Sequence, residues 1–396
     1  MARELAISLY LLVFRLVFMF FNLMPLKDKT TFVVTFGDNS KYVFEEMRRQ
    51  NIQDDVVFLC KGKGLSYFKD HEYIVPVPFE SFNVVNWLKS VYHLATSKKI
   101  FVDNYFGFLA VTNFREEVEC IQLWHATGAV KKFGLEDRSI TGRSHRALKR
   151  FKAVYKKFDK VVVGSDVMAN IFMKAFNVKN ENILKTGIPR TDFFFNEDAR
   201  KKVISKLKLE NKQFADNKII LYAPTYRDNE LDEFRLKLDI GKMKQELGED
   251  YVLILRLHPA IKKSVDYSEL YPGFVFDYSG SDYDINDLLV IADYLITDYS
   301  SIPYEFSLLG KPMLFFTYDL EKYSRERGII EGSFPGPVVK ETDTIIELIL
   351  QNQFDLKIVE DFSKKWNKYS NGASSRNLVN YMFEEDFKEV KHQQAL

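Results

Sequence analysis

The chain has 396 residues, which is too long for one compact hydrophobic core and predicts two domains. Hydrophobic residues make up 46% of the chain and charged residues 28%, which excludes an intrinsically disordered protein. The net charge of +1 excludes a molecule that binds polyanions over its whole surface. Two cysteines in apolar runs, Cys60 and Cys120, argue against a disulfide framework or a cysteine-based metal site.

The first predicted element is Leu5–Met24, a segment that is apolar except for Arg15. As a helix it would be about 30 Å long, enough to span a bilayer. Arg15 lies near its middle, where a spanning helix would bear a penalty of roughly 2.5 to 3.5 kcal/mol. A helix lying in the membrane interface can instead direct Arg15 to the headgroups. We therefore expect residues 1–28 to lie in the interface, with a spanning anchor and a helix buried on the protein as alternatives.

From Thr31 the pattern alternates between strands and helices. The predicted strands are Thr31–Phe36, Val56–Cys60, Tyr73–Val77, Lys99–Asp103, Cys120–Trp124, Lys160–Val163 and Ile183–Thr186. Helical segments between them include Lys41–Gln50, Phe82–Thr96 and Asp166–Phe176. Residues 29–195 are therefore predicted to form a doubly wound α/β domain, and the segment contains no GxGxxG fingerprint.

A polar stretch, Asp192–Asn217, leads into a second series of the same kind. Its predicted strands are Lys218–Ala223, Tyr251–Leu257, Gly273–Phe276, Asp293–Thr297 and Pro312–Phe316. Residues 196–396 are thus predicted to form a second Rossmann-like domain. We expect the two domains to face a cleft at the carboxyl ends of their strands, where α/β proteins bind ligands.

One strand–helix–strand unit of the second domain, Ala292–Phe316, carries Asp298-Tyr299-Ser300-Ser301 between its strand and its helix. Pro303 lies in the first helical turn, where proline costs no hydrogen bond. The serines can cap the helix, and the backbone N–H groups of such a junction can bind an anion. Both an ordinary cap and a phosphate site fit this stretch taken alone.

Two of the six histidines end predicted strands, one in each domain. His125 is followed by small residues, Ala126-Thr127-Gly128-Ala129, which would allow close approach of a substrate. His258 is followed by Pro259, which ends the strand. A single histidine at a strand end is commonly structural, whereas matched positions in two domains favour a shared catalytic role.

Two further strand ends carry hydroxyl and guanidinium groups. They are Tyr222–Arg227, with Thr225 and Arg227, and Thr186–Asp192, with Arg190. Each is a common kind of turn when taken alone. Together with the stretch at Asp298 they would supply donors and cations at several strand ends, an arrangement suited to a diphosphate.

Residues 131–160 contain eleven Lys or Arg against three acids, a local net charge of +8. A solvated helix face is one interpretation. Nucleic acid binding has no recognised module to support it. Because an apolar segment precedes this stretch, an anionic membrane surface is the favoured partner.

Several motifs resemble one family, the CDP-glycerol glycerophosphotransferases of wall teichoic acid synthesis. They are Gln122–Gly134, Thr186–Asp192, Tyr222–Arg227, Arg256–Pro259, and Thr297–Ser301 with Glu305 and Gly310–Pro312, and they occur in the family's order. The late segments Tyr323–Gly328, Gly336-Pro337 and Asn371-Gly372 are similar to the family's closing motifs.

The resemblance implies a GT-B fold, peripheral on the cytoplasmic face of the cell membrane. It also implies transfer of glycerol phosphate from CDP-glycerol to a polyprenyl-diphosphate-linked acceptor with release of CMP, and other teichoic acid enzymes as further partners. His125 matches the expected general base, His258 a residue that contacts the diphosphate, and Glu305 one that holds the ribose. The residues expected to bind substrate are Lys131, Thr225, Arg227, Arg256, Asp298, Ser300, Ser301 and Glu305. No cofactor and no metal are expected.

The residues after Trp124-His125 depart from the polymerases of the family, which typically have Gly and then Thr-Pro-Leu-Lys. Here Ala126–Val130 looks more like the primases, which add the first glycerol phosphate to an N-acetylmannosaminyl-N-acetylglucosamine lipid, and the compact length points the same way. The alternatives are a polymerase or second-unit transferase, a ribitol-phosphate donor, a sugar-nucleotide glycosyltransferase, and a non-catalytic nucleotide-binding protein.

Overall fold

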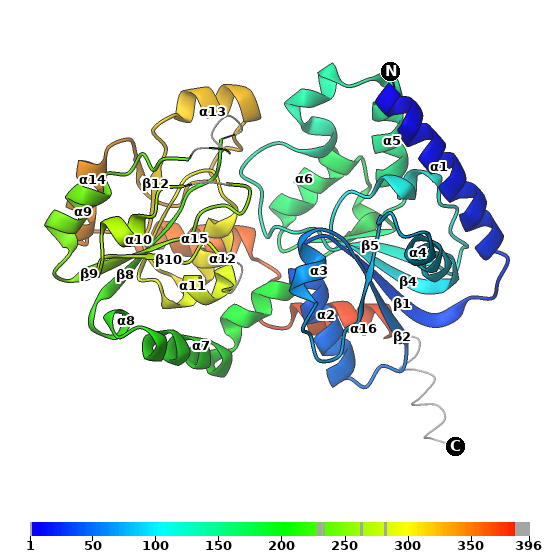
Figure 1. Ribbon diagram of the computed structural model, residues 1–396, viewed down its shortest axis with the longest axis horizontal. Helices are drawn as coiled ribbons and strands as arrows, with labels where there is room; N and C mark the ends of the chain where they lie inside the picture. Colours follow the sequence, from blue (N-terminus) through cyan, green and yellow to red (C-terminus); the bar gives the residue numbers. More distant parts are fainter. Residues whose placement is uncertain (1, 228–231, 233, 262–263, 281–282, 385–396) are drawn as a thin grey trace. The chain divides into compact units, whose positions relative to one another are not determined.

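The computed structural model describes residues 2–227, 232, 234–261, 264–280 and 283–384. The chain forms two compact α/β units (Figure 1). The first unit contains the chain up to Ala126, Phe133–Asp192, and the chain from Lys368 onward. The second unit contains Thr127–Lys132 and Phe193–Asn367. Met1 and residues 385–396, which the predicted domains include, lie outside the described residues.

The first unit is built on a seven-stranded parallel sheet with the order β3-β2-β1-β4-β5-β6-β7. Its strands are β1 Lys27–Val34, β2 Asp55–Cys60, β3 Pro76–Pro78, β4 Ser97–Val102, β5 Glu119–Gln122, β6 Lys160–Val162 and β7 Ile183–Leu184. The register places Phe32 of β1 between Phe58 of β2 and Phe101 of β4. Their rings stack at centroid distances of 4.7 and 4.8 Å, so aromatic side chains pin the centre of the sheet.

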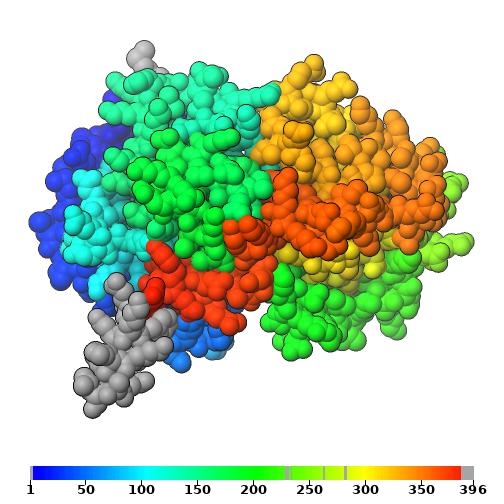
Figure 2. Space-filling view, turned by 180° about the vertical axis from the view of Figure 1, so that it is seen from behind, coloured from blue at the N-terminus to red at the C-terminus, as the bar shows by residue number. Residues whose placement is uncertain are grey.

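Helices cover this sheet. They are α1 Ala2–Phe21, α2 Asp38–Arg49, α3 Lys63–Tyr67, α4 Val84–Thr96, α5 His145–Tyr155, α6 Asp166–Phe176 and α16 Ser374–Met382, with short 3-10 turns η1 Gly107–Val111, η2 Gly134–Glu136, η3 Arg138–Gly142 and η4 Asn180–Asn182. On one face, apolar residues of α2 and α16 share a single core with β1, β2 and β4. Figure 2 shows α16, in red, on the surface of this unit beside α2, in blue.

The second unit is built on a six-stranded parallel sheet with the order β10-β9-β8-β11-β12-β13. Its strands are β8 Lys218–Ala223, β9 Tyr251–Leu255, β10 Val275–Asp277, β11 Tyr294–Thr297, β12 Met313–Phe316 and β13 Val338–Val339. The central strands are nearly continuous apolar runs, as expected for a parallel sheet buried on both faces. Both sheets therefore follow the 3-2-1-4-5 order of Rossmann folds.

Helices α9 Ile240–Leu247 and α14 Thr342–Gln351 pack on one face of the second sheet and complete its core. The other elements of this unit are α7 Glu197–Glu210, α8 Gln213–Asp216, α10 Tyr267–Leu270, α11 Ile285–Ile291, α12 Ile302–Phe306, η6 Ser307–Leu309, α13 Leu320–Arg327 and α15 Leu356–Trp366. A 3-10 segment, η5 Pro189–Phe195, connects the first unit to the second.

The twelve predicted strands all occur, with small shifts at their ends. The largest shift concerns Thr31–Phe36, where the strand is Lys27–Val34. For Tyr73–Val77 the strand is Pro76–Pro78. It is an edge strand, the position in which proline is tolerated because the ladder needs no donor on the open side. The strand β13 was not predicted, because two residues carry no readable pattern.

The division of the chain differs from a single boundary near residue 195. Residues 127–132 belong to the second unit although they lie between segments of the first, and the chain returns to the first unit at Lys368. Asp192 secures this return, because its carboxylate accepts hydrogen bonds from the Ser374 and Ser375 N–H groups, both at 2.8 Å, at the start of α16. The chain thus passes between the units four times.

Candidate active site

The chain turns at Trp124, just after the end of β5. The Trp124 φ of +58° lies in the left-handed region, which is unfavourable for a bulky aromatic residue. The Trp124 N–H donates to Gln122 Oε1 at 2.8 Å, and the Trp124 carbonyl accepts from Asn39 Nδ2 at 3.0 Å. These bonds hold a strained turn immediately before His125, as often occurs at functional sites.

The His125 ring contacts two aromatic rings and is held at one nitrogen. It stacks on Phe36 at a centroid distance of 4.3 Å, and the Trp124 ring lies tilted against it, also at 4.3 Å. Its Nδ1 lies 3.2 Å from the Asp103 carbonyl oxygen. A carbonyl can only accept a hydrogen bond, so Nδ1 carries the proton in the neutral ring. Nε2 is then the basic nitrogen.

Burial lowers the pKa of His125 to about 4, outweighing the bond to the Asp103 carbonyl, which raises it, and adding to the effect of the nearby Arg190 cation. The imidazole is therefore neutral at the pH of a cell. A neutral ring with a free basic nitrogen can accept a proton from a hydroxyl group. The structure thus gives His125 the properties that a general base requires.

Two residues that support this turn, Asp103 and Asn39, were not singled out from the sequence, whereas Arg190 was. Asp103 contributes its carbonyl to His125 and its carboxylate to the loop that carries Phe36. Asn39 accepts from the Arg190 N–H at 3.1 Å, and the Arg190 guanidinium donates to the His125 carbonyl at 3.1 Å. Asp103 ends an apolar strand as Asp298 does, so a signal for it was present in the sequence.

The small residues after His125 serve the second unit and do not form an open substrate surface. Residues 127–130 are buried. A Cβ atom on Gly128 would lie 2.2 Å from the Tyr304 ring, so only glycine fits there. The Tyr304 hydroxyl donates to the Ala129 carbonyl at 2.8 Å. The expectation that this stretch allows close approach of a substrate is therefore corrected, because an aromatic ring of the protein occupies that space.

In the second unit, the ends of β8 and β11 meet at a buried carboxylate. Asp298 Oδ1 accepts from the Thr225 N–H at 2.9 Å and from the Thr225 hydroxyl at 2.8 Å. Asp298 Oδ2 accepts from Arg227 Nη2 at 3.1 Å. Burial raises the pKa of Asp298, although Arg227 and the Thr225 bonds act against that rise.

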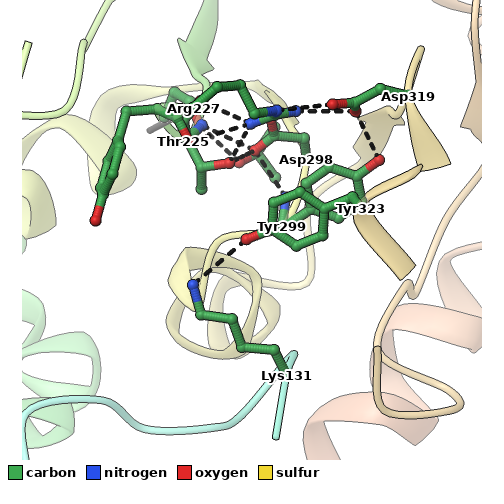
Figure 3. Close-up of polar contacts among 10 residues, drawn as sticks. Lys131, Thr225, Arg227, Asp298, Tyr299, Asp319 and Tyr323 are labelled. Carbon is green, nitrogen blue, oxygen red and sulfur yellow. Dashed lines mark hydrogen bonds and ion pairs between the residues drawn. The ribbon is translucent and has the colours of Figure 1, made fainter. Parts of the chain in front are cut away.

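Arg227 lies between two carboxylates (Figure 3). It donates to Asp319 through Nε at 2.8 Å and Nη2 at 3.0 Å, as well as to Asp298. Tyr299 and Tyr323 stack at 3.7 Å, and the Arg227 guanidinium lies 5.1 and 5.2 Å from their rings. Burial would lower the pKa of Arg227, but the bond to Asp319 and the charge of Asp298 raise it overall, so this side chain is a fixed cation.

Lys131 approaches the same group of residues. Its Nζ donates to the Tyr323 hydroxyl at 3.3 Å (Figure 3). The backbone of residues 131–132 pairs with the chain after α13. Lys131 forms a β-bridge with Ile329, and the Lys132 N–H donates to the Gly328 carbonyl. The Lys131 amine is therefore fixed beside the Arg227 network of the second unit.

Two further predicted residues, Arg256 and His258, follow the end of β9, which is next to β8 in the sheet. The Arg256 guanidinium donates to the backbone carbonyls of Tyr278, Gly280 and Tyr283, the last at 2.9 Å. These bonds stabilise the loop after β10, a role not expected from the sequence. His258 is exposed, and its ring lies 4.5 Å from Tyr226.

The junction after β11 differs in detail from the predicted cap. The N-cap residue is Ser301, and its side chain makes no capping bond, so the predicted side-chain cap is absent there. Ser300, one residue earlier, accepts from the Ile302 N–H through Oγ at 3.2 Å. Pro303 lies in the first turn as predicted. Glu305 is buried, and its Oε1 accepts from the Thr127 hydroxyl at 2.7 Å.

The sheet order brings several of the residues predicted to bind substrate together within the second unit. β9, β8 and β11 are neighbours, so Arg256, His258, Thr225 and Asp298 follow three adjacent strand ends. His125 belongs to the first unit. Among the residues that the structure describes, no group of three His, Cys, Asp or Glu side chains could hold a metal ion.

Parallel sheets of this order, with polar and cationic residues at adjacent carboxyl ends, define α/β proteins that bind nucleotides or other phosphorylated ligands. Residues 16–384 match the family model described as CDP-Glycerol:Poly(glycerophosphate) glycerophosphotransferase. The chain belongs to this family of transferases, as its motifs predict.

The chain is also similar to individual relatives and to a solved structure. It is 38% identical to the teichoic acid glycerol-phosphate primase of Bacillus subtilis over 385 residues, which cover 96% of this chain and 98% of the relative. It is 35% identical to the teichoic acid ribitol-phosphate primase of Bacillus spizizenii, over 87% of each chain. The structure of the wall teichoic acid polymerase TagF has the same fold, with a TM-score of 0.78 and 24% identity over 98% of this chain and 99% of that one.

Proposed function

We propose that this protein is a teichoic acid glycerol-phosphate primase. It would transfer one glycerol phosphate from CDP-glycerol to a polyprenyl-diphosphate-linked N-acetylmannosaminyl-N-acetylglucosamine acceptor and release CMP. The observation that carries this proposal is the 38% identity to a primase along nearly the whole of both chains. The residues after His125, which resemble those of primases, support it.

The reaction needs a base for the acceptor and cations for the leaving group. The acceptor hydroxyl attacks the phosphorus that bears glycerol, a new P–O bond forms, and the anhydride bond to CMP breaks. His125 Nε2 takes the hydroxyl proton, which its neutral state and its Nδ1–H tautomer support. Negative charge develops on CMP and requires donors or cations, which the strand ends of the second unit supply.

We assign the donor to the second unit and the acceptor to the first, in a GT-B arrangement. His258 and Lys131 are the best candidates for direct contact with the diphosphate, because His258 is exposed and Lys131 ends beside the Arg227 network. Ser300 and Ser301, both half-buried, would bind phosphate oxygens at the start of α12. Arg227, Arg256 and Asp298 would shape this surface, and Thr225 and Glu305 complete the proposed donor site.

Product analysis tests the proposal. The purified protein is incubated with CDP-glycerol and a synthetic disaccharide-lipid acceptor, and the lipid products are separated by mass. We expect CMP release that requires the acceptor and a product with one added glycerol phosphate. A ladder of products would instead indicate a polymerase, and UDP release from a UDP-sugar would indicate a glycosyltransferase.

A ribitol donor is the second candidate, because the chain is 35% identical to a ribitol-phosphate primase. The same assay with CDP-ribitol separates the two. A higher kcat/KM with CDP-ribitol than with CDP-glycerol would replace the glycerol assignment and leave the transferase assignment intact.

We propose further that α1 lies in the plane of the membrane interface. Its length and mean hydropathy of 2.0 would also allow it to cross a bilayer. One side of α1, with Phe14 and Phe18, is buried against Trp87, Phe108 and Phe114 of its own unit. At about 100° per residue the opposite side of α1 consists of the exposed Leu5, Leu9, Leu12, Leu16 and Met19, and Arg15 lies at the rim between the two sides. A helix packed in this way supports an interfacial position, in which Arg15 reaches headgroups.

Neighbouring elements extend this surface. Helix α4 contacts α1 and exposes Val84, Val85 and Leu88. Helix α5 carries the exposed cations Arg146, Lys149 and Lys152, and the exposed Lys156 directly follows it. The helix joins α1 through an ion pair between Arg150 and Glu4 at 3.1 Å. An apolar helix beside a basic helix favours an anionic bilayer on the cytoplasmic face as the partner.

Charged substitutions on the outer side of α1 are expected to release the protein from membranes. Leu9 and Leu16 are 62% and 58% exposed, so Leu9→Glu with Leu16→Glu leaves the core unchanged. A leucine side chain buried in lipid contributes about 1.5 to 3 kcal/mol, so each change should weaken binding about tenfold or more. The measurement is co-sedimentation with vesicles of phosphatidylglycerol and phosphatidylcholine.

The matched control is Leu209→Glu, a substitution of an 85% exposed leucine on α7. It should bind vesicles as the unchanged protein does. Equal binding of all three proteins would contradict the interfacial role of α1.

A further inference from the structure

The two units contain the same arrangement at the point where each strand order reverses. In the first sheet this point lies between β1 and β4, and in the second between β8 and β11. Asp103 directly follows β4, and Asp298 directly follows β11. Each carboxylate accepts backbone N–H groups of the loop after the neighbouring first strand. The two aspartates are thus structural counterparts, although their sequence surroundings show no repeat.

Asp103 is bound more extensively than its counterpart. Its carboxylate accepts from three successive backbone N–H groups, those of residues 35–37, at 2.8 to 3.1 Å. Its side chain is buried, and burial raises the pKa of the carboxyl to about 6 although these three bonds lower it. An isolated carboxylate would not remain buried, so the loop and the aspartate stabilise one another.

The loop that Asp103 binds is in contact with His125. Phe36, the middle residue of residues 35–37, stacks on the imidazole at 4.3 Å with an interplanar angle of 24°. The Asp103 carbonyl oxygen accepts the Nδ1–H of the same ring. One residue therefore determines the tautomer of His125 through its carbonyl and the position of the stacked ring through its carboxylate.

We propose that Asp103 is a positioning residue for the base His125. It acts through the Phe36 loop and its own carbonyl, and it keeps Nε2 basic and fixed in direction. This inference deepens the proposed function and rests on it, since it assumes that His125 accepts the acceptor proton. In the second unit, Asp298 fixes Thr225 and Arg227 in the same manner.

The test is Asp103→Asn. An amide has one acceptor oxygen, whereas a carboxylate has two. In either orientation of the amide, its NH2 group faces a backbone N–H of residues 35–37, and two donors cannot bond to one another. We expect the loop to shift and kcat to fall about 100-fold, with the KM for CDP-glycerol changed by no more than about twofold. The variant should also expose His125 to water, which raises its pKa. The acid limb of the plot of kcat against pH should therefore move from near pH 4 toward the ordinary histidine range.

The matched control is Asp159→Asn. The Asp159 carboxylate accepts from the Cys120 N–H at 2.8 Å at the opposite end of β5, so it makes the same kind of bond away from His125. Both variants should lose thermal stability, but only Asp103→Asn should change kcat and the pH limb. A second variant, Phe36→Leu, removes the stacked ring without changing the carboxylate, and it should move the pH limb in the same direction.

Nitrogen-15 NMR of histidine-labelled protein gives a readout that does not depend on turnover. We expect His125 in the unchanged protein to be the Nδ1–H tautomer and a mixture of tautomers in folded Asp103→Asn. An unchanged tautomer together with an unchanged pH limb would overturn the inference. Failure of the unchanged protein to transfer glycerol phosphate would instead overturn the proposed function.

Discussion

Replacement of His125 by alanine is expected to reduce kcat by about 10² to 10⁴, the contribution typical of a general base. The loss follows from the geometry, because Nε2 is the only basic nitrogen of a ring whose Nδ1–H is bound to the Asp103 carbonyl. The affinity for CDP-glycerol should not change, since His125 and the proposed donor-binding residues lie in different units. CMP release measures the first effect and calorimetric titration with CDP-glycerol the second.

The control for this prediction is His145→Ala, an exposed histidine at the start of α5 in the same unit. It should retain full activity. The pH profile of the unchanged enzyme adds a second check: because the His125 pKa is lowered to about 4, the neutral base persists well below the ordinary histidine range. A variant His125→Ala with more than about a tenth of the normal kcat would contradict the catalytic role.

Arg227→Met is expected to destabilise the second unit by about 3 to 5 kcal/mol, because it leaves the buried Asp298 and the partly buried Asp319 without their cation. The Arg227 and Asp298 side chains are only 10% and 4% exposed, so water cannot replace the lost bonds. The cost comes from ionised carboxylates. It should therefore shrink as the pH falls and Asp298, whose pKa burial raises, becomes protonated.

Hydrogen exchange measured by mass spectrometry is the suitable assay, because it resolves the strands of the second unit from those of the first. The control is Lys206→Met, which removes an exposed i,i+4 pair with Glu210 on α7 and should change stability by less than about 1 kcal/mol. Equal exchange rates in β8 and β11 for Arg227→Met and Lys206→Met would show that the network contributes little.

The sequence predicts the two sheets well, for identifiable reasons. Strands such as Lys218–Ala223 and Asp293–Thr297 are apolar runs that are followed by Pro224 and Asp298, so their positions can be read locally. Residues at the ends of parallel strands necessarily gather at one edge, which is why Thr225 and Asp298 were expected near one another and are hydrogen-bonded.

What the sequence did not predict depends on contacts between distant segments. The Asp103 carboxylate binds a loop more than 60 residues earlier in the chain. Arg227 was expected among the substrate-binding residues, but its bond to Asp319, which no strand-end pattern marked, was not predicted. Gly128 was interpreted as space for a substrate, because a sequence does not reveal the Tyr304 ring that fills that space.

Residues 127–132 affect how chimeric proteins can be built from members of this family. A donor unit transferred as residues 193–367 alone would lack the Ala129 carbonyl that binds Tyr304 and the Thr127 hydroxyl that binds Glu305. A chimera meant to change glycerol for ribitol should therefore carry residues 127–132 from the same parent as residues 193–367. The unit to which we assign the donor is discontinuous in sequence, and it includes residues that directly follow the proposed base.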